Sequence, residues 1–418
     1  MINCSMFSSQ KNGQQLGSIL LIGDDRVTLT VSRSFSRMGY RVILGSSSKS
    51  SLCGSSRYVD EVWKIPPLKE EGQKGLITRL IDYLEVRKDI FAVFPIGETE
   101  INAFLHKEAD LPKRIQVISV DSETASLCLD KAKLLSKVTE LGIPCSSSYV
   151  VNSYEELCDA QRKLEFPCVV KPVTNNYAHM AEKAVILEEP KSLEYFTRWP
   201  TPGASLLIQK YFKGCRHNLY FAANKGEIIS LVEVKILLTD VANDTGLAVW
   251  GKSVAPTEKL ERYTRKLVKS LGYHGVGCAQ YLYDEETSEC SFLELNPRLG
   301  ANLAITQHCG VDFSKLFFQL TENPTSSKIK VNDYVKDIHY VWLTGALAGI
   351  TKSIETGQCT VYQSVKSLLK ALRLCLTCRS HIVWHTSDPV PATILLMKSL
   401  KYYAGAVGRK LLRMTPRV

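Results

Sequence analysis

Three polar side chains occupy alternate positions in SFLELNPRLG, residues 291–300 of the 418-residue chain. Glu294 and Asn296 lie two residues apart on a predicted strand, so their side chains point to the same face, and Arg298 follows at the strand's exit. Burying charged groups without partners is costly, so this row needs either neighbouring polar groups or a ligand.

The strand that precedes this row carries a further polar group. GCAQYLYD, residues 277–284, is joined to the row by the turn Asp284–Glu289, and antiparallel pairing about that turn brings Gln280 close to Glu294. One carboxylate and two amide oxygens on one face are hard-oxygen ligands that suit Mg²⁺ beside phosphates. The fork of Arg298 would hold a phosphate oxygen. The pattern equally fits a half-buried strand whose polar residues pair with their neighbours.

Three lysines upstream stand where predicted elements begin or end. Lys131 starts a helix in LDKAK, Lys171 ends the apolar strand of FPCVVKP, and Lys183 in AEKAV enters the next strand. A lysine at the mouth of a strand is a common phosphate contact, because it acts as a point charge. Each lysine alone is typical of a solvated surface position. The prediction that they contact phosphates therefore depends on their order along the chain.

One acidic residue near the N-terminus is a candidate substrate contact. FPIGETE puts Glu98 just beyond the end of the predicted strand Ile90–Pro95, where ligands gather in open α/β sheets. Glu98 either contacts a substrate, such as an ammonium group, or stabilises the start of the next helix. Hydrolase chemistry is not indicated, because neither a Gly-x-Ser-x-Gly elbow nor a His-Glu-x-x-His helix occurs.

The elements that carry these residues begin with a βαβ unit. Residues 18–45 contain an apolar strand, a turn at Gly23, a helical apolar period and a second strand, which indicates a parallel sheet. A dinucleotide fingerprint would have three glycines where Gly23 stands alone, so that cofactor is only weakly indicated. A Rossmann-like domain is predicted over residues 18–120, after a disordered tail over residues 1–17.

Short turns between antiparallel strands, with flanking helices, predict an α+β domain over residues 121–330. One helix is expected to start at Ser122 or Thr124 and to continue through LDKAKLLSKVTELG. Leu219–Ala223 and Ile228–Val234 are expected to form a hairpin around an Asn-Lys-Gly turn.

Charge is distributed unevenly. The net charge is +10, and residues 338–418 account for +9 of it, with eleven lysines and arginines against two acids. A helical basic region is predicted over residues 331–418, with a helix starting at Asp388-Pro389. That helix either packs on the body of the protein or lies on an anionic membrane surface, since its uncharged runs are too short to span a membrane. Nucleic acid is not expected, because aromatic residues do not interleave with the basic run.

The cysteines bear on the cellular compartment. The chain has thirteen of them, an odd number, and its first seventeen residues are polar. Free thiols in a reducing compartment are therefore predicted, and with them a cytoplasmic protein, with peripheral contact at the inner membrane face as the finer hypothesis.

The order of these motifs resembles the ATP-grasp superfamily, the fold of D-alanine–D-alanine ligase, biotin carboxylase and the carbamoyl-phosphate synthetase large subunit. The resemblance covers about residues 18–320, and its most specific part, E-x-N-P-R with an upstream Gln, looks like the metal site of the carbamoyl-phosphate synthetase branch. It implies α/β and α+β content in an ATP-grasp fold, with a Rossmann-like pre-ATP-grasp domain and a C-terminal helical basic extension.

The resemblance also implies roles for individual residues. Lysines would hold the ATP phosphates, a hinge would offer backbone groups to adenine, and polar strand residues would bind one or two Mg²⁺, with Mn²⁺ as an alternative. These sets are Lys131, Lys171 and Lys183 for the phosphates; Gln209, Lys210, Tyr211 and Phe212 for the hinge; and Gln280, Glu294 and Asn296 for the metal.

Two departures from the family pattern concern the nucleotide. His217 stands near the place where the family usually has an acid that binds the ribose hydroxyls. The loop after Lys171 lacks the glycines that many relatives use to close over the phosphates, and Asn175, Asn176 and His179 are candidates to donate hydrogen bonds there instead.

The implied activity is that of an ATP-dependent carboxylate–amine ligase that works through an acyl phosphate. Arg298 is the first candidate to stabilise the oxyanion and Lys235, in LVEVKILL, is the second, although Lys235 equally fits an exposed hairpin position. A bicarbonate-dependent carboxylase, a carboxylate kinase and a non-catalytic nucleotide-binding scaffold at a membrane are the alternatives. The expected partners are a small carboxylate and an amine, and a homodimer is left open.

Overall fold

The computed structural model of the chain describes residues 16–48, 50–66, 68–174, 180, 183–199, 203–241, 243–323 and 333–414. The predicted tail over residues 1–17 therefore lies almost wholly outside the described residues, and so do Asn175, Asn176 and His179. The chain divides into two compact units, Met1–Ile118 and Ser119–Val418.

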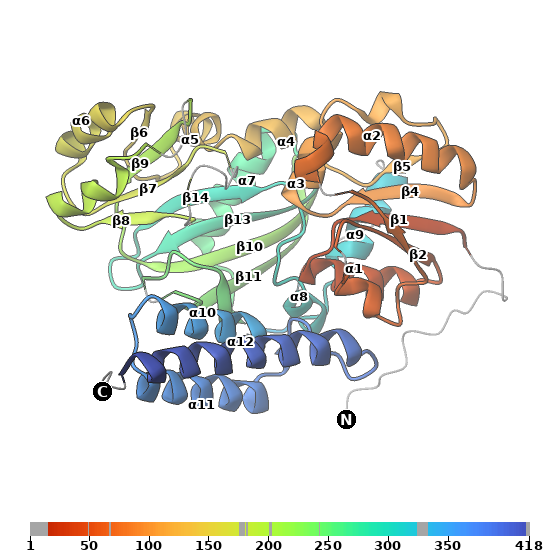
Figure 1. Cartoon of the computed structure of the whole chain (residues 1–418). Coiled ribbons are helices and arrows are strands. Elements are labelled where there is room, and N and C mark those ends of the chain that lie inside the picture. The colour runs from red at the N-terminus through yellow and green to blue at the C-terminus, as the bar shows by residue number, and fades with distance from the viewer. Residues whose placement is uncertain are drawn as a thin grey trace. The chain divides into compact units, whose positions relative to one another are not determined.

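The first unit is an open parallel sheet with flanking helices (Figure 1). Its elements are β1 (Ser18–Ile22), α1 (Arg26–Arg37), β2 (Arg41–Ser46), η1 (Cys53–Ser55), β3 (Glu61–Lys64), α2 (Leu68–Val86), β4 (Ile90–Pro95), α3 (Glu98–Phe104), η2 (Glu108–Asp110) and β5 (Gln116–Val117). The strand order is β3-β2-β1-β4-β5 and every pairing is parallel, which confirms the predicted parallel sheet.

Apolar strand faces and one helix form the core of this unit. Leu20, Ile43 and Val93 come from three neighbouring strands and pack with Leu80 and Leu84 of α2, and all five are buried. Removing such side chains from water is the main favourable term for a sheet of this kind.

The second unit contains two sheets (Figure 1). Its elements up to the large sheet are α4 (Ser122–Leu129), α5 (Lys131–Glu140), β6 (Ser148–Val151), α6 (Tyr154–Leu164), β7 (Cys168–Pro172), β8 (Val185–Leu187), η4 (Pro190–Phe196) and β9 (Leu206–Lys210). The following elements are β10 (Cys215–Asn224), β11 (Glu227–Thr239), β12 (Ala248–Ser253), α7 (Glu258–Ser270), β13 (Gly275–Tyr283), β14 (Cys290–Asn296), α8 (Ala304–His308), α9 (Phe313–Glu322), β15 (His339–Val341), α10 (Leu343–Glu355), α11 (Val361–Thr377), β16 (Ser380–His381) and α12 (Val390–Met414).

The two sheets differ in size but are both built mainly from antiparallel pairs. The small sheet has the order β6-β9-β7-β8, and the large sheet has the order β14-β13-β10-β11-β12-β15-β16, with one parallel pair at β15–β16. The predicted combination of a parallel α/β unit with an α+β unit is therefore confirmed.

The hairpin β10–β11 confirms one local prediction and extends it. Both strands are longer than the predicted segments, Leu219–Ala223 and Ile228–Val234. Lys225 and Gly226 form the turn with φ of +48° and +89°, the left-handed conformation that a tight hairpin requires.

The single helix predicted through LDKAKLLSKVTELG is wrong, because α4 and α5 are separated at Asp130. Asp130 has φ −92° and ψ 99°, and its carboxylate accepts hydrogen bonds from the backbone of Ala132 and Lys133, both at 3.1 Å. A side chain that caps a helix in this way starts a new helix. The break also lets the backbone N–H of Lys131 donate to the carbonyl of Val173 at 3.2 Å, next to the end of β7.

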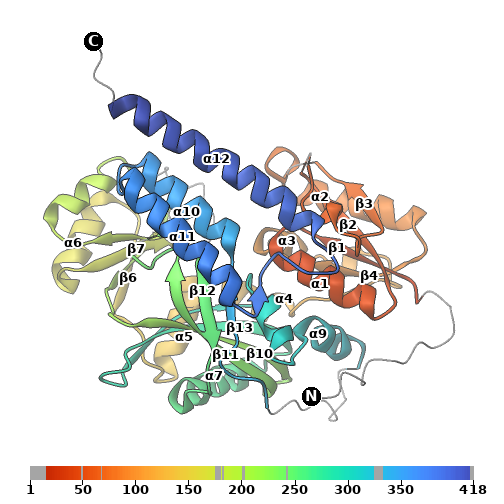
Figure 2. The same cartoon turned by 90° about the horizontal axis from the view of Figure 1, so that it is seen from below.

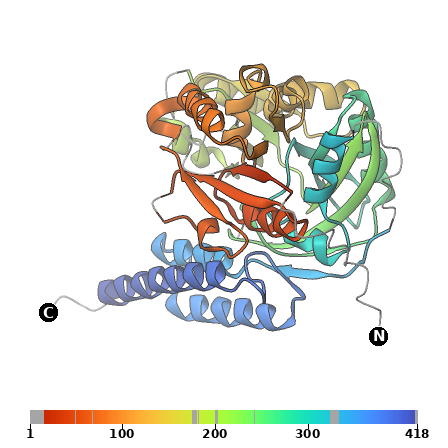
Figure 3. The ribbon, with the colours of Figure 1, turned by 90° about the vertical axis from the view of Figure 1, so that its right-hand side faces the viewer.

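The C-terminal region is a layer of three helices lying side by side, α10, α11 and α12 (Figure 2 and Figure 3). The same region, predicted as helical, also supplies β15 and β16 to the large sheet. Among the helices that the structure describes, none has the length and apolarity that crossing a membrane requires.

Helix α12 begins directly after Asp388-Pro389, as predicted, and is continuous through its glycines. Near its end, Arg409 forms an ion pair with Glu355 of α10 at 2.5 Å, and Lys410 donates to the carbonyl of Cys359. Two of the predicted basic side chains are therefore engaged in packing this helix on the body of the protein.

Candidate functional site

Polar side chains form a row across three neighbouring strands of the large sheet. Gln280 on β13 lies directly opposite Glu294 on β14, which confirms the predicted pairing, and Asn218 on β10 lies opposite Gln280 on its other side. Residues directly opposite in antiparallel strands present their side chains to the same face. The row is therefore Asn218, Gln280 and Glu294, and Asn218 is a member that sequence reasoning missed.

Hydrogen bonds among neighbours account for the polar residues at the end of β14. Asn296 Nδ2 donates to Glu294 Oε1 at 2.8 Å, and Arg298 Nη2 donates to Asn296 Oδ1 at 3.3 Å. Arg298 Nη1 also donates to the carbonyl of Leu299 at 3.2 Å. The three side chains thus hold one another in place along one edge of the sheet.

The oxygen atoms of this row fit a hard divalent cation. Glu294 supplies a carboxylate and Gln280 an amide oxygen beside it. Asn218 is 6% exposed, and its Oδ1 is buried with no hydrogen-bond partner among the described residues. Buried polar atoms without partners are uncommon in native structures, and carboxylate and amide oxygens are the ligands that Mg²⁺ prefers.

The carboxylate of Glu294 is strongly held in its ionised form. Burial by itself would raise its pKa. The charges of Lys183, Lys131 and Lys171, together with the hydrogen bond from Asn296, outweigh that effect and lower the pKa of Glu294 to about 2. The predicted phosphate lysines and the predicted metal ligand are therefore close enough to interact.

The three lysines reach this place from different segments of the chain. Lys131 opens α5, is buried, and donates from Nζ to the carbonyl of Pro172 at 3.2 Å. Lys171 lies on β7, where burial lowers its pKa to about 8, with the charge of Glu294 opposing the shift. Lys183 keeps an exposed face, yet its pKa is lowered, first by partial removal from water.

Two arginines add to this positive charge. The charges of Arg216 and Arg298 lower the pKa of Lys183 further, although the charge of Glu294 opposes them. The Nε atoms of both arginines are buried, and neither has a hydrogen-bond partner in the part of the chain that the structure describes. Like charges gathered about one carboxylate repel one another, so the arrangement is expected where an anion such as a phosphate binds.

The predicted hinge is Gln209, Lys210, Tyr211 and Phe212. Gln209 and Lys210 end β9, and the N–H groups of Lys210 and Tyr211 donate to the carbonyls of Ser147 at 2.9 Å and Pro167 at 3.0 Å. These backbone donors are therefore used inside the chain. Phe212 follows and lines a cavity of about 310 Å³ beside Ser291.

His217 and Lys235 lie on the opposite face of the large sheet from Gln280. His217 directly precedes Asn218 on β10, and it lies opposite Lys235 on β11. Successive side chains on a strand point to opposite faces, so Asn218 and Gln280 share one face while His217 and Lys235 share the other. The structure does not bring these two predicted residues to the row.

A buried carboxylate that sequence reasoning missed holds His217. Glu233 is 0% exposed, and its Oε1 lies 2.6 Å from His217 Nδ1. Glu233 also accepts hydrogen bonds from the N–H and Oγ1 of Thr257, each at 2.7 Å, at the start of α7. Lys235 forms an ion pair with Glu285. We assign these contacts to folding and leave His217 and Lys235 out of the proposed site.

Glu98 belongs to the first unit. It is the first residue of α3, in the acidic first turn of that helix, and it is partly buried. A negative charge at that place interacts favourably with the helix dipole. Substrate contact by Glu98 stays a prediction.

Comparisons with known proteins agree with this geometry. The family model for the carbamoyl-phosphate synthase L chain, ATP binding domain, matches residues 130–327. The carbamoyl phosphate synthase large chain of Clostridium acetobutylicum is 25% identical over 292 residues, which are 68% of this chain and 25% of that one. The chain thus spans about a quarter of the length of this relative.

Two solved structures have a similar fold. A biotin carboxylase from Campylobacter jejuni, in a β-γ-ATP complex, has a TM-score of 0.61 at 19% identity and covers 77% of this chain and 74% of its own. The second is the biotin carboxylase domain dimer of Hydrogenobacter thermophilus 2-oxoglutarate carboxylase, with MgADP, ADP and bicarbonate. It has a TM-score of 0.62 at 16% identity, and the match covers 78% of this chain and 74% of that one. The family match and the fold identify residues 130–327 as an ATP-grasp domain, which confirms the resemblance.

Proposed function

We propose that this ATP-grasp chain is an ATP-dependent ligase that joins a carboxylate to an amine. The observation that supports it most is the gathering of Lys131, Lys171 and Lys183 about the ionised Glu294. Positioned cations offset the charge of a phosphoryl group in transfer, which is the main demand of this chemistry.

The proposed reaction has two steps. A substrate carboxylate oxygen attacks the γ-phosphorus of ATP, ADP leaves, and an acyl phosphate forms. The amine nitrogen then attacks the acyl carbon, the carbon–oxygen bond to phosphate breaks, and the amine gives up a proton. Arg298 is the cation proposed to stabilise the oxyanion between these events, because its buried Nε has no hydrogen-bond partner among the residues that the structure describes.

ATP and Mg²⁺ are the proposed cofactors, and Mn²⁺ is an alternative metal. Lys131, Lys171 and Lys183 would hold the phosphates, while Glu294 and Gln280 would hold the metal together with Asn296 or Asn218. When bound, a divalent ion supplies charge neutralisation for the phosphate oxygens. The MgADP complex of the H. thermophilus domain supports this assignment.

The experiment that tests the ligase is phosphate release from Mg-ATP by the purified chain. Separate reactions receive pools of amino acids or sugar acids, each with and without an amine, in buffer depleted of carbon dioxide. The proposal expects release in a pool that holds both substrates. No release in any pool would argue against it and would favour the nucleotide-binding scaffold.

A bicarbonate-dependent carboxylase is the second candidate. Both solved structures compared above are biotin carboxylases, and one of them contains bicarbonate. Bicarbonate would take the place of the substrate carboxylate at the same cations. Phosphate release that requires added bicarbonate would favour this candidate, and release with a carboxylate but no amine would favour a carboxylate kinase.

Glu98 is proposed to contact the ammonium group of a substrate, supported by its place just beyond β4. We expect Glu98→Gln to raise the KM for that substrate about tenfold while the KM for ATP stays unchanged, because one charge-assisted hydrogen bond is lost. Steady-state kinetics with each substrate varied in turn measures both values. Unchanged kinetics with a lowered Tm would instead indicate a role in starting α3.

Peripheral contact with an anionic membrane is proposed for α11 rather than for α12. Five apolar side chains of α11 recur at helical spacing and are all exposed: Tyr362, Val365, Leu369, Leu372 and Leu376. Lys366 and Arg373 are exposed beside them. An exposed apolar stripe edged by basic residues suits an interface with anionic lipid.

Vesicle flotation tests the α11 surface. The full chain is expected to float with vesicles that contain an anionic lipid at low salt and to stay unbound with neutral vesicles. Leu369→Glu with Leu376→Glu should abolish flotation, because both changes put charge into the apolar stripe. The control Gln363→Glu with Thr377→Glu adds equal charge elsewhere on α11. Equal flotation of both double variants would refute the proposal.

A homodimer is also proposed, supported by the dimer named for the H. thermophilus domain. Light scattering of the full chain would check it.

A further inference from the structure

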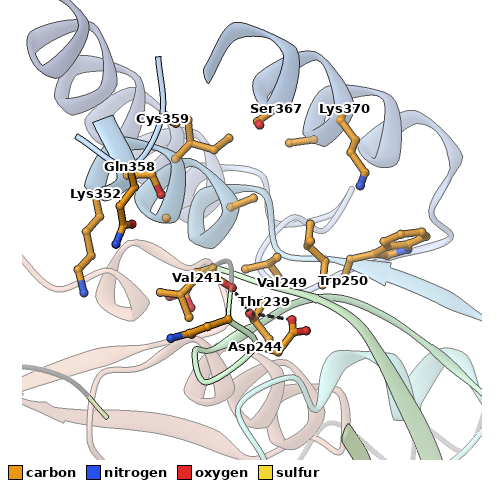
Figure 4. Close-up of a pocket in the computed structure, with 18 of the residues that line it drawn as sticks. Thr239, Val241, Asp244, Val249, Trp250, Lys352, Gln358, Cys359, Ser367 and Lys370 are labelled. Carbon is orange, nitrogen blue, oxygen red and sulfur yellow. Dashed lines mark hydrogen bonds between the residues drawn. The ribbon is translucent and has the colours of Figure 1, made fainter. Parts of the chain in front are cut away.

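A pocket of about 610 Å³ lies away from the polar row, between the C-terminal helices and the hairpin β11–β12 (Figure 4). Its apolar part comes from the strands and from both α10 and α11: Leu238, Val249, Ala346, Ile350, Ala371 and Leu374. Val249, Ala346 and Ala371 are buried in one cluster with Leu238 packed against it. The volume lies in the range of small-molecule sites.

Two lysines line this pocket, Lys352 of α10 and Lys370 of α11 (Figure 4). The Nζ of Lys370 lies 6.0 Å from the centre of the Trp250 ring. Within the part of the chain that the structure describes, Lys370 has no carboxylate partner. A cation beside an aromatic ring and an apolar floor is suited to receive an organic carboxylate.

Two carboxylates come from the loop that follows β11. Asp240 Oδ1 accepts from the N–H of Leu247 at 2.6 Å, and Asp244 Oδ1 accepts from Thr239 Oγ1 at 3.4 Å. Both acids line the pocket. Each uses one oxygen in these bonds, and its Oδ2 is left without a partner among the described residues. An ammonium group is the natural partner for two such oxygens.

Two glycines give the acidic wall its shape. A Cβ at Gly246 would lie 2.0 Å from Asp240 Oδ1, and a Cβ at Gly349 of α10 would lie 2.1 Å from the Asp240 carbonyl oxygen. A side chain at Gly349 would displace the backbone of this loop, and one at Gly246 would displace the side chains of Asp240 and Val241. The close approach of α10 to Asp240 is therefore a built feature of the pocket.

The floor of the pocket is joined to the loop that carries Arg298. Asn302, four residues further along the chain, is buried and donates from Nδ2 to the carbonyl of Ala248 at 3.1 Å and to Tyr340 Oη at 2.9 Å. Ala248 directly precedes Val249 on β12. The loop that carries Arg298 is thus hydrogen-bonded to a strand that lines the pocket.

We propose that this pocket binds a zwitterionic amino acid or short peptide with an apolar side chain. Its carboxylate meets Lys370, its ammonium group meets Asp240 and Asp244, and its side chain lies on the apolar floor. A fatty acid would leave the two acids unpaired, and a simple amine would leave Lys370 unpaired, so a ligand with both charges fits best. The proposal does not rest on the ligase activity, because binding requires neither ATP nor metal.

Isothermal titration of the full chain without nucleotide tests the ligand class. The probes are L-leucine, L-leucyl-L-leucine, N-acetyl-L-leucine, which lacks the ammonium group, and L-leucinamide, which lacks the carboxylate. We expect one or both zwitterions to bind, and each single-charge analogue of leucine to bind at least about tenfold more weakly, because one charged hydrogen-bonding pair is lost. Absence of binding by both zwitterions, or equal binding of N-acetyl-L-leucine, would overturn the assignment.

Two substitutions locate the binding. Lys370→Met should weaken binding of the zwitterion at least about tenfold, while Lys366→Met, one turn earlier on α11 and outside the pocket, should leave it unchanged. Asp240→Asn should weaken it similarly, because its amide oxygen can still accept from Leu247 while the charge is lost. Unaltered binding in both Lys370→Met and Asp240→Asn, with normal thermal unfolding, would place the ligand elsewhere.

Discussion

Replacing Glu294 with glutamine is expected to lower ATP-dependent phosphate release by at least about a hundred-fold. The pKa of Glu294 is lowered to about 2, so the carboxylate is ionised at any working pH and is ready to hold a metal ion. Glutamine keeps the shape and can still accept the hydrogen bond from Asn296, but it removes the negative charge about which the lysines gather. Steady-state kinetics measures the loss, first as the rate of phosphate release at saturating Mg-ATP and then as that rate over a range of Mg-ATP concentrations.

Glu289→Gln is the matched control for this result. Glu289 is exposed on the turn between the same two strands, so the same chemical change there should leave turnover intact. Thermal unfolding of both variants separates a lost ligand from a lost fold. Near-normal turnover in Glu294→Gln would rule out Glu294 as the main metal ligand.

Replacing Lys171 with methionine is expected to stabilise the nucleotide-free protein by about 1–3 kcal/mol and to weaken ATP binding by at least about tenfold. Burial lowers the pKa of Lys171 to about 8, and the charges of Lys131 and Lys183 act in the same direction, while Glu294 opposes them. The folded chain therefore holds this charge at a cost, which ATP phosphates would offset. Urea unfolding and equilibrium nucleotide binding measure the two effects.

The pH dependence gives this prediction a second check. The pKa of Lys171 is about 8 in the folded chain against an ordinary value of 10.5, so between these values the unfolded chain holds more protons and stability rises with pH. The gain in the free energy of unfolding from Lys171→Met should be complete below pH 8 and should shrink as the pH rises towards 10.5. Lys191→Met, at an exposed position, should show no such change. A variant less stable than the unmodified chain at pH 7 would contradict the argument.

The part of the site that could be predicted from the sequence depends on short-range geometry. Gln280 and Glu294 face each other because a short turn between β13 and β14 leaves few ways to pair the two strands. Glu294 and Asn296 share a face because alternation along a strand is a property of the backbone. The parallel sheet of the first unit followed from the same local patterns.

The missed members of the site depend on contacts between distant segments. Asn218 joins the row only because β13 pairs with β10 on the side away from β14. No local sequence pattern reveals that strand order. Its neighbour His217 is equally polar, and only the pairing of the strands decides which of the two faces Gln280. Sequence motifs pointed to His217, whose buried partner Glu233 lies within an apolar run and gives no signal of its own.

The break between α4 and α5 escaped prediction for a different reason. The apolar period continues through Asp130, so the sequence pattern favours one helix. The break is stabilised by the Asp130 cap and by the hydrogen bond from Lys131 to Val173, which is about forty residues away in the chain. The pairing of β15 with β12 and β16 was missed for the same reason, since these strands are remote from one another in sequence.

The two faces of β10 have a consequence for mutational scanning. His217 and Glu233 are buried and hydrogen-bonded to each other behind the sheet, while Asn218 stands in front of it. Substitutions at all three positions are expected to lower turnover in a library screen. The soluble yield of each variant would distinguish the pair that supports the sheet from the residue in the proposed site. Intolerance to substitution is therefore a poor guide to the proposed active face of this strand.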